Sequence, residues 1–476
     1  MTGRMVNTVN NIIWSPVLVG LLIFAGIFLS VRTRFVQFRR IGHMARLSCN
    51  THQTDGEHSV SAFQAFCLAL SGRVGSGNIV GVATAIGIGG PGALFWMWLL
   101  AFLGAGTSFV ESTLGQIYKY DHNGHQYGGP AAYIHNGLKS RAMGIVFSIV
   151  VIAGFSCLLT TVQSNGVAAA FNNSFNVPPA ISGVALALLL APVLMGGLKR
   201  IVMVSSVIAP FMSIAYILIS LVIVLSNWKD IPELFGTIFT SAFGIHPACG
   251  GILGSTISYG VKRGLFSNEA GQGSGAIISA AANADSPAQQ GLVQAFSILV
   301  DTLVICTATG LMILSAGTYN IVDAGTGALL VANAPELGAN FVGYSQAAIS
   351  SILPGFGGKF IAIALLFFVF TSLLAYYYYV ESSIVHLCHH FHKMQRLEKL
   401  FIHIFRIVLL LSLVYGAVNE ALTIWQLGDI GAGLMCWINV IAILILSPKA
   451  IAALKDYESG QSGTIPGNFP HSSSTR

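Results

Sequence analysis

Long apolar runs fill most of this sequence, and they limit what the chain can fold into. A helix that crosses a membrane needs about 20 residues, and the runs approach or exceed that length. Only 8% of the residues are charged, against about 25% in soluble proteins, so a soluble fold is excluded. We predict an all-α polytopic membrane protein with about 11 transmembrane helices, at residues 14–31, 61–89, 92–117, 143–170, 180–197, 201–226, 237–260, 288–316, 353–381, 401–418 and 421–447.

The basic residues predict the orientation of these helices. With the N-terminus outside, 19 of the 23 Lys and Arg residues fall in inner connections or the tail, and three fall outside. Loops on the cytoplasmic side carry the excess of positive charge. The N-terminus is therefore predicted outside and the C-terminus in the cytoplasm. The net charge of +6 then reflects contact with anionic lipid, and no nucleic-acid partner is expected.

Two of the predicted helices are interrupted by glycine and proline. The second contains Gly72, Gly75 and Gly77, and the seventh is broken at about 244–251. Five helices separate the two starts, and an odd repeat length reverses orientation. This indicates two inverted five-helix repeats, at 61–226 and 237–447, after an N-terminal segment 1–60 with one extra helix and before a cytoplasmic tail, 448–476. Paired broken helices are typical of alternating-access transporters, whose sites lie at the breaks.

The first break offers partners for a zwitterion and a cation. The helix restarts near Asn78, and free N–H groups at a helix start stabilise a carboxylate. Carbonyls of Ser71 and Val74, released before the break, suit a sodium ion. Helix capping by Ser76 and Asn78 is the alternative.

Other polar residues at membrane depth leave alternatives open. Thr371 and Ser372 either bind sodium or bond back to their own helix. Gln163 and Asn165 line a pocket or join helices. Charged residues inside a membrane are candidates for function or for ion pairs, and they are Arg73, Glu111, Asp301 and Glu381.

Two polar clusters complete the candidates. The stretch 260–273 is expected in the cytoplasm, as an inner gate or a tight turn. Histidines 386, 389, 390 and 392 with Cys388 are expected to be surface residues, so no metal beyond sodium is predicted. No nucleophile–base pair or phosphate-binding loop indicates an enzyme.

Several motifs resemble those of the bacterial sodium:alanine (alanine or glycine:cation) symporter family. They are Gly72–Ile79, Gly89–Trp96, Gly128–Pro130, Gly196–Arg200, Arg263–Gly273 and Asp301–Thr307, and the resemblance covers residues 14–447. It implies a LeuT-type fold in the bacterial inner membrane and sodium-coupled uptake of small neutral amino acids, mainly alanine and glycine. Sodium is then the co-transported ion, and no organic cofactor is implied.

The resemblance also implies roles for individual residues. It places the substrate carboxylate on the backbone of Gly75, Ser76 and Gly77, beside Asn78. It places sodium between the carbonyls of Ser71 and Val74 and the hydroxyls of Thr371 and Ser372. The second break, Phe243, Gly244 and Ile245, is expected to close the pocket. Serine stands at position 76, where the family commonly has threonine, which leaves the preferred amino acid open, with serine and glutamine as further candidates.

Two other functions remain open. A proton-coupled symporter would use Asp301 or Glu111 as the titrating group. A channel or a sensor with the same fold would show flux without coupling, or binding without uptake.

Overall fold

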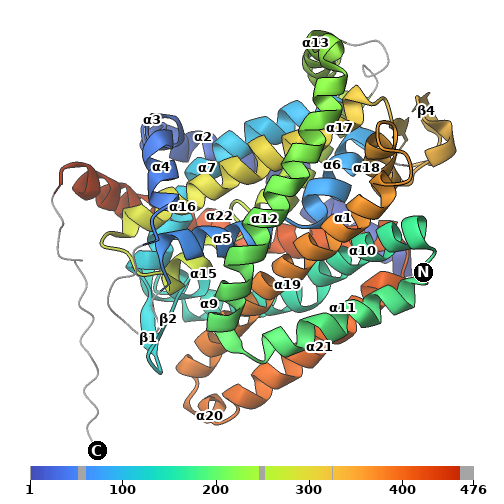
Figure 1. The fold of residues 1–476 in the computed structure, drawn as a ribbon. Coiled ribbons are helices and arrows are strands. Elements are labelled where there is room, and N and C mark those ends of the chain that lie inside the picture. Colours follow the sequence, from blue (N-terminus) through green and yellow to red (C-terminus); the bar gives the residue numbers. More distant parts are fainter. Residues whose placement is uncertain (1, 52–59, 246–251, 324, 461–476) are drawn as a thin grey trace, which may run out of the picture.

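The computed structural model describes residues 2–51, 60–245, 252–323 and 325–460. The described chain is a bundle of long helices with two short β-hairpins (Figure 1). By length and composition, eight described helices can cross a membrane, and nine can when one bent pair counts as a single span. The all-α prediction is therefore confirmed, while the number eleven stays a prediction.

The N-terminal part contains the extra helix and the first break. Helix α5 starts where Ser61 and Gln64 form a reciprocal capping box. It ends at Arg73, and the chain bends by 54° before it continues. The elements of this part are α1 (Thr2–Ile13), α2 (Pro16–Arg32), α3 (Val36–Arg39), α4 (Ile41–Ser48), α5 (Ala62–Arg73), the π-helical η1 (Gly77–Gly81) and α6 (Val82–Gly89). Within the predicted N-terminal segment 1–60, the extra helix α2 is thus followed by two short helices, α3 and α4.

The next helices follow the predicted spans closely. A hairpin turns at Asn123 and Gly124, which both have positive φ, as a two-residue hairpin turn requires. The elements are α7 (Ala93–Ile117), β1 (Tyr120–His122), β2 (His125–Tyr127), α8 (Pro130–Gly137), α9 (Arg141–Ala153), η2 (Gly154–Leu158), α10 (Leu159–Phe175), α11 (Pro179–Leu194), α12 (Gly197–Ser226) and η3 (Trp228–Asp230). Helices α9 and α10 are joined through the π-helical η2 into one span.

The predicted span over 237–260 is wrong. Two separate helices occupy this region, α13 (Ile231–Ala242) and α14 (Leu253–Asn268), and α15 (Ser274–Ala281) follows. Figure 1 shows α13 projecting from one end of the bundle. The predicted interruption at 244–251 falls between α13 and α14, and residues 246–251 lie outside the described residues.

The last part begins with a span that carries a π-helical segment. Its elements are α16 (Pro287–Leu299), η5 (Val300–Cys306), α17 (Thr307–Ser315), β3 (Asn320–Val322), β4 (Leu329–Ala332), η6 (Pro335–Leu337), α18 (Phe341–Ser350), α19 (Gly357–His390), α20 (His392–Gln395), α21 (Glu398–Val418) and α22 (Ala421–Glu458). Between α17 and α19 the chain forms one hairpin, the short helix η6 and α18. Helix α19 packs against α5, α9, α10 and α12, so it lies at the centre of the bundle beside the first break.

Candidate functional site

The first break brings four predicted residues together. Val74 is extended after the end of α5, which frees the following backbone. The Gly75 N–H donates to Asn78 Oδ1 at 2.9 Å, and the Ser76 N–H donates to Gln163 Oε1 at 2.9 Å. All of these side chains are buried. The unwound backbone therefore presents two N–H groups to side-chain carbonyl oxygens inside the bundle.

Gln163 reaches the break from α10, and a second hydrogen bond holds its side chain there. Its Nε2 donates to the Tyr376 hydroxyl of α19 at 2.9 Å. The neighbouring Ser76 hydroxyl is buried, and no hydrogen-bond partner for it lies among the described residues. Buried hydroxyls are normally bonded, so Ser76 Oγ is an available partner at the break. Asn165, the other polar residue noted on this helix, instead joins helices by donating to the Gly416 and Asn419 carbonyls.

Helix α19 covers the break from the side predicted for sodium. The Ser372 hydroxyl lies 3.0 Å from the Val74 carbonyl and 2.9 Å from the Phe368 carbonyl. The hydroxyls of Thr371 and Ser71 contact carbonyls of their own helices. The structure thus brings Ser372 to Val74 directly.

Asp301 connects the break to the opposite side of the bundle. Asn78 Nδ2 donates to its Oδ1 at 2.6 Å. The hydroxyls of Ser267 and Thr302 donate to its Oδ2 at 2.8 and 2.9 Å. Asp301 is fully buried in the π-helical η5, and these three donors are uncharged. The bond from Asn78 holds that side chain in place, and Asn78 Oδ1 in turn accepts from the Gly75 N–H.

A second break faces the first, and it is not where the sequence placed it. Helix α14 ends at Asn268, Glu269 is left-handed with φ of 57°, and Gly271 and Gly273 have φ of 81° and 92°. Only glycine adopts such angles at low cost. Gly77 makes the approach possible, because a Cβ there would lie 3.2 Å from the Phe266 ring and from Ser267 Cα. Residues 269–273, predicted as part of a cytoplasmic loop, are thus a buried break between α14 and α15.

Phe243, Gly244 and Ile245 are predicted to close the pocket, and the structure places them elsewhere. Phe243 and Ile245 are 52% and 70% exposed. The Phe243 ring packs on Phe95 and Trp96 at the start of α7, and Gly244 has a positive φ in the turn after α13. An apolar run with glycine and proline resembles a broken helix in sequence, but Phe243 and Gly244 follow the end of α13. The structure does not bring these residues to Gly75–Asn78.

Two buried charged side chains, Arg73 and Glu111, lie beside the two breaks. Arg73 Nε donates to the Asn268 carbonyl at 2.8 Å, and Nη1 donates to Gln294 and Ser297. Asn439 donates to Glu111 Oε2 at 2.9 Å and to the Gly271 carbonyl at 3.0 Å. Arg73 and Glu111 thus tie the two breaks to each other and to α22.

An ion pair that the sequence analysis missed lies on α14 and α22. Arg263 pairs with Asp429, and Lys262 Nζ is 3.7 Å from the same carboxylate. The Arg263 guanidinium lies 4.6 Å from the centre of the Trp425 ring. Asp429 stands alone among apolar residues, a signal that the sequence offered. Lys262 and Arg263 therefore lie buried in helix α14 and not in a loop.

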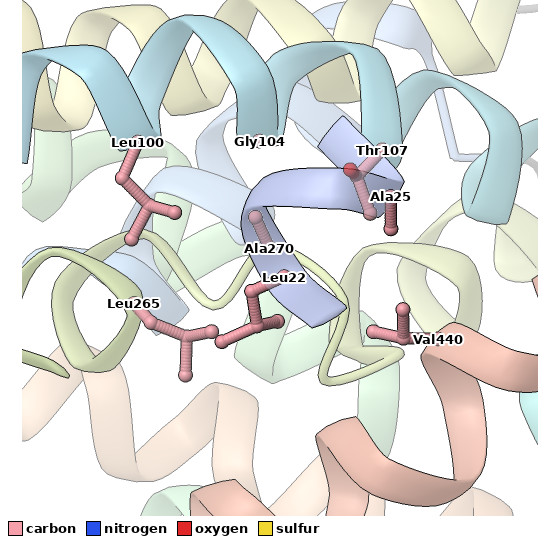
Figure 2. A pocket seen from close by; sticks show the side chains of 8 residues that line it. All are labelled: Leu22, Ala25, Leu100, Gly104, Thr107, Leu265, Ala270 and Val440. Carbon is pink, nitrogen blue, oxygen red and sulfur yellow. The ribbon is translucent and has the colours of Figure 1, made fainter. Parts of the chain in front are cut away.

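An apolar hollow near the extra helix α2 reaches the second break at Ala270 (Figure 2). Side chains of α2, α7, α14 and α22 also line it, and Thr107 is the one polar side chain among its lining residues. Thr107 Oγ1 already donates to the Leu103 carbonyl of its own helix. The hollow offers a ligand no free polar group, so the two breaks remain the candidate site.

Comparison with known proteins decides the family. The model of the sodium:alanine symporter family matches residues 1–466. The chain belongs to the sodium:alanine symporter family. It is 44% identical to the sodium/proton-dependent alanine carrier protein of Bacillus sp. strain PS3, over 84% of this chain and 89% of the relative. It is 37% identical to the sodium/alanine symporter AgcS of Methanococcus maripaludis, over 95% and 96%.

Solved structures support the fold of this family member. The structure of MhsT in complex with L-phenylalanine superposes with a TM-score of 0.57 at 14% identity, over 84% of this chain and 99% of that chain. The structural neighbours of this chain are LeuT-fold transporters. The predicted family, the LeuT-type fold and the class of multi-pass membrane transporter are confirmed.

Proposed function

We propose that this protein couples sodium entry to the uptake of small neutral amino acids, alanine and glycine above all, by alternating access. The family and the names of the two relatives support both the cation and the amino acid. We place the protein in the cell membrane of a bacterium, the inner membrane, with the N-terminus outside. In this orientation the inward electrical gradient contributes about 2.3 kcal/mol for each sodium ion per 100 mV.

The single observation that carries this proposal is the Ser76 N–H at the first break, which donates to a carbonyl oxygen of Gln163. A substrate carboxylate oxygen has the same acceptor chemistry, and the positive end of η1–α6 favours its charge. We propose that the carboxylate takes this position, with the backbone of Gly75 and Gly77 and the Ser76 hydroxyl around it. Gln163 and Asn78 then turn their amides to the substrate.

The close packing around the break favours a small substrate. A Cβ on Gly166 would lie 3.1 Å from Ser76 Cβ, and one on Gly428 would lie 2.4 Å from Val162 Cγ2. The Phe266 and Trp425 rings pack on each other, with centres 5.1 Å apart. Alanine and glycine need the least space between these helices.

The sodium site is proposed on the other face of the break. The Ser71 and Val74 carbonyls are the acceptors, with the Thr371 and Ser372 hydroxyls opposite them. The support is the 3.0 Å distance between Ser372 Oγ and the Val74 carbonyl, because one ion can bind both oxygens after a small displacement. Binding there joins α19 to the unwound segment and so couples the ion to the substrate position.

The two breaks suggest how the chain is divided. We propose one repeat from α5 to α12 and a second that opens with α14 and α15, each beginning with a broken helix. This moves the start of the second repeat from residue 237 to α14. The Arg263–Asp429 pair joins α14 to α22. We propose that it closes the path on one side of the substrate position.

Proton coupling is the second candidate, because one relative is named as sodium/proton-dependent. Glu111 is the residue to test, since its Oε1 is buried without a hydrogen-bond partner among the described residues. Asp301 already accepts three hydrogen bonds, so its proton exchange would disturb the first break. Loss of proton-driven uptake in Glu111→Gln, with sodium-driven uptake retained, would support this candidate.

Uptake of labelled alanine into proteoliposomes tests the proposal. The purified protein is given an inward sodium gradient, an inward proton gradient or neither. Saturable accumulation that requires sodium, with competition by unlabelled glycine, is the expected result. Accumulation with protons alone would move the coupling to a carboxylate. No accumulation in any condition would contradict the substrate assignment.

A further inference from the structure

Three histidines converge at the end of α19, far from the candidate transport site. His386 and His390 are four residues apart and share one face of the helix. His135 reaches them from α8. The ring centres of His135 and His390 are 4.1 Å apart, those of His386 and His390 are 4.5 Å apart, and those of His135 and His386 are 6.0 Å apart. One nitrogen from each ring lies within 4.8 Å of the other two.

The bonding of these rings is incomplete among the described residues. His386 is 3% exposed, yet neither of its ring nitrogens has a hydrogen-bond partner. His135 Nδ1 is also buried and without a partner. His390 contacts the His386 carbonyl through Nδ1 at 2.9 Å, which leaves its Nε2 for another ligand. Buried polar atoms of this kind normally have a partner, so the convergence of these nitrogens points to a bound species.

We propose that His135, His386 and His390 form a binding site for a zinc ion. Imidazole nitrogen is a preferred ligand of Zn²⁺, and three histidines with one open position for water are a known ligand set. Tetrahedral geometry with Zn–N distances of about 2.0–2.1 Å places the ligand atoms roughly 3.3 Å apart. The nitrogens here need to approach by an ångström or so, within reach of rotation about the side-chain bonds.

The surroundings hold the ligands in position. Arg141 Nη2 donates to the His390 carbonyl at 2.7 Å, and the guanidinium stacks on Phe391, so the end of α19 is fixed to the start of α9. A further polar contact lies nearby, between His122 Nε2 and the Glu398 carboxylate, which are 3.0 Å apart. Zinc at the three histidines therefore connects α8, which follows the first hairpin, to the end of α19. Figure 1 shows this region at the end of the bundle opposite α18.

Metal binding to the full-length protein tests the proposal. The protein is purified in detergent without a polyhistidine tag, dialysed against Zn²⁺, and its zinc content is measured by mass spectrometry. We expect one zinc ion per chain and a rise in melting temperature. Cobalt in place of zinc should give the visible absorption of a tetrahedral site. His135→Ala and His386→Gln should each weaken binding at least 10-fold and remove the rise.

His403→Ala is the matched control. His403 is an exposed histidine of α21 whose Nδ1 contacts the Lys399 carbonyl, and this variant should bind zinc as the original chain does. Size-exclusion profiles and melting temperatures without metal show that each variant is folded. If the unaltered protein binds no zinc at stoichiometric concentrations, the proposal is wrong. It is also wrong if folded His135→Ala and His386→Gln bind zinc with unchanged affinity.

Discussion

Replacing Gly75 by alanine tests the geometry of the first break with one methyl group. Gly75 has no positive φ, so alanine is compatible with the backbone and any effect comes from space. The added Cβ would lie 2.6 Å from Ser372 Oγ and 2.7 Å from Gln163 Oε1. Both distances are too short for a real contact, so the two side chains must move away.

The cost follows because the displaced side chains are the proposed ligands. In the structure Gln163 contacts the Ser76 N–H and Ser372 contacts the Val74 carbonyl, and in the proposed bound state Gln163 turns to the substrate and Ser372 to sodium. A neutral hydrogen bond contributes about 0.5–1.5 kcal/mol, so loss of one such contact to each ligand costs about 1–3 kcal/mol in all. Since 1.4 kcal/mol is a factor of ten, half-saturation by alanine, sodium or both should rise roughly 5- to 150-fold.

The assay is concentration-dependent uptake into proteoliposomes, with equal amounts of each variant. Gly20→Ala in α2 is the matched control, because a Cβ there meets no atom within 4 Å, and its uptake should not change. Gly75→Ala uptake with unchanged half-saturation for both alanine and sodium would refute the reasoning. It would show that neither Gln163 nor Ser372 contributes to binding.

Three further predictions concern other parts of the protein. Ser372→Ala should raise the sodium concentration for half-maximal uptake roughly 2- to 10-fold. Ser383→Ala, which removes a hydroxyl that donates to the Tyr379 carbonyl of its own helix, should leave that concentration unchanged. Equal sodium dependence of Ser372→Ala and the original chain would exclude Ser372 as a ligand. Asp429→Asn leaves buried Arg263 without its counter-charge, so thermal unfolding should show a loss of about 3–5 kcal/mol in the free energy of unfolding. Asp456→Asn, at an exposed position, should leave that free energy unchanged. Equal stability of Asp429→Asn and the original chain would mean that the pair is not formed. In the β3–β4 turn, hydrogen bonds from the Thr326 hydroxyl and from the backbone of Thr326 and Gly325 lower the pKa of Asp323. The turn is therefore stabilised at pH values above the ordinary pKa of Asp, and it loses this stabilisation as the pH falls through the lowered pKa. Hydrogen exchange, corrected for intrinsic rates, should show that amides 325–328 are less protected at low pH. Protection that does not change with pH would contradict this.

The sequence alone determined the class of fold and the first break. Apolar runs of membrane length need no tertiary information, because the bilayer itself sets the length of each helix. The break at Gly72–Asn78 is equally local, since each of three closely spaced glycines disfavours a regular helix. The position of Gln163 as a polar residue within an apolar helix also marked it for the site, and the structure places it on Ser76.

Only the tertiary structure decided which distant residues meet. The second break was misplaced because two segments are rich in glycine, 244–251 and 269–273, and sequence spacing does not show which one packs on Gly77. The partners Arg263 and Asp429 are 166 residues apart, and His135 is some 250 residues from His386 and His390. Local sequence patterns report helix length and helix ends, whereas such pairs depend on how the helices pack. The histidines of α19, expected to be plain surface residues, become a candidate zinc site only because the fold brings His135 from α8 to meet them.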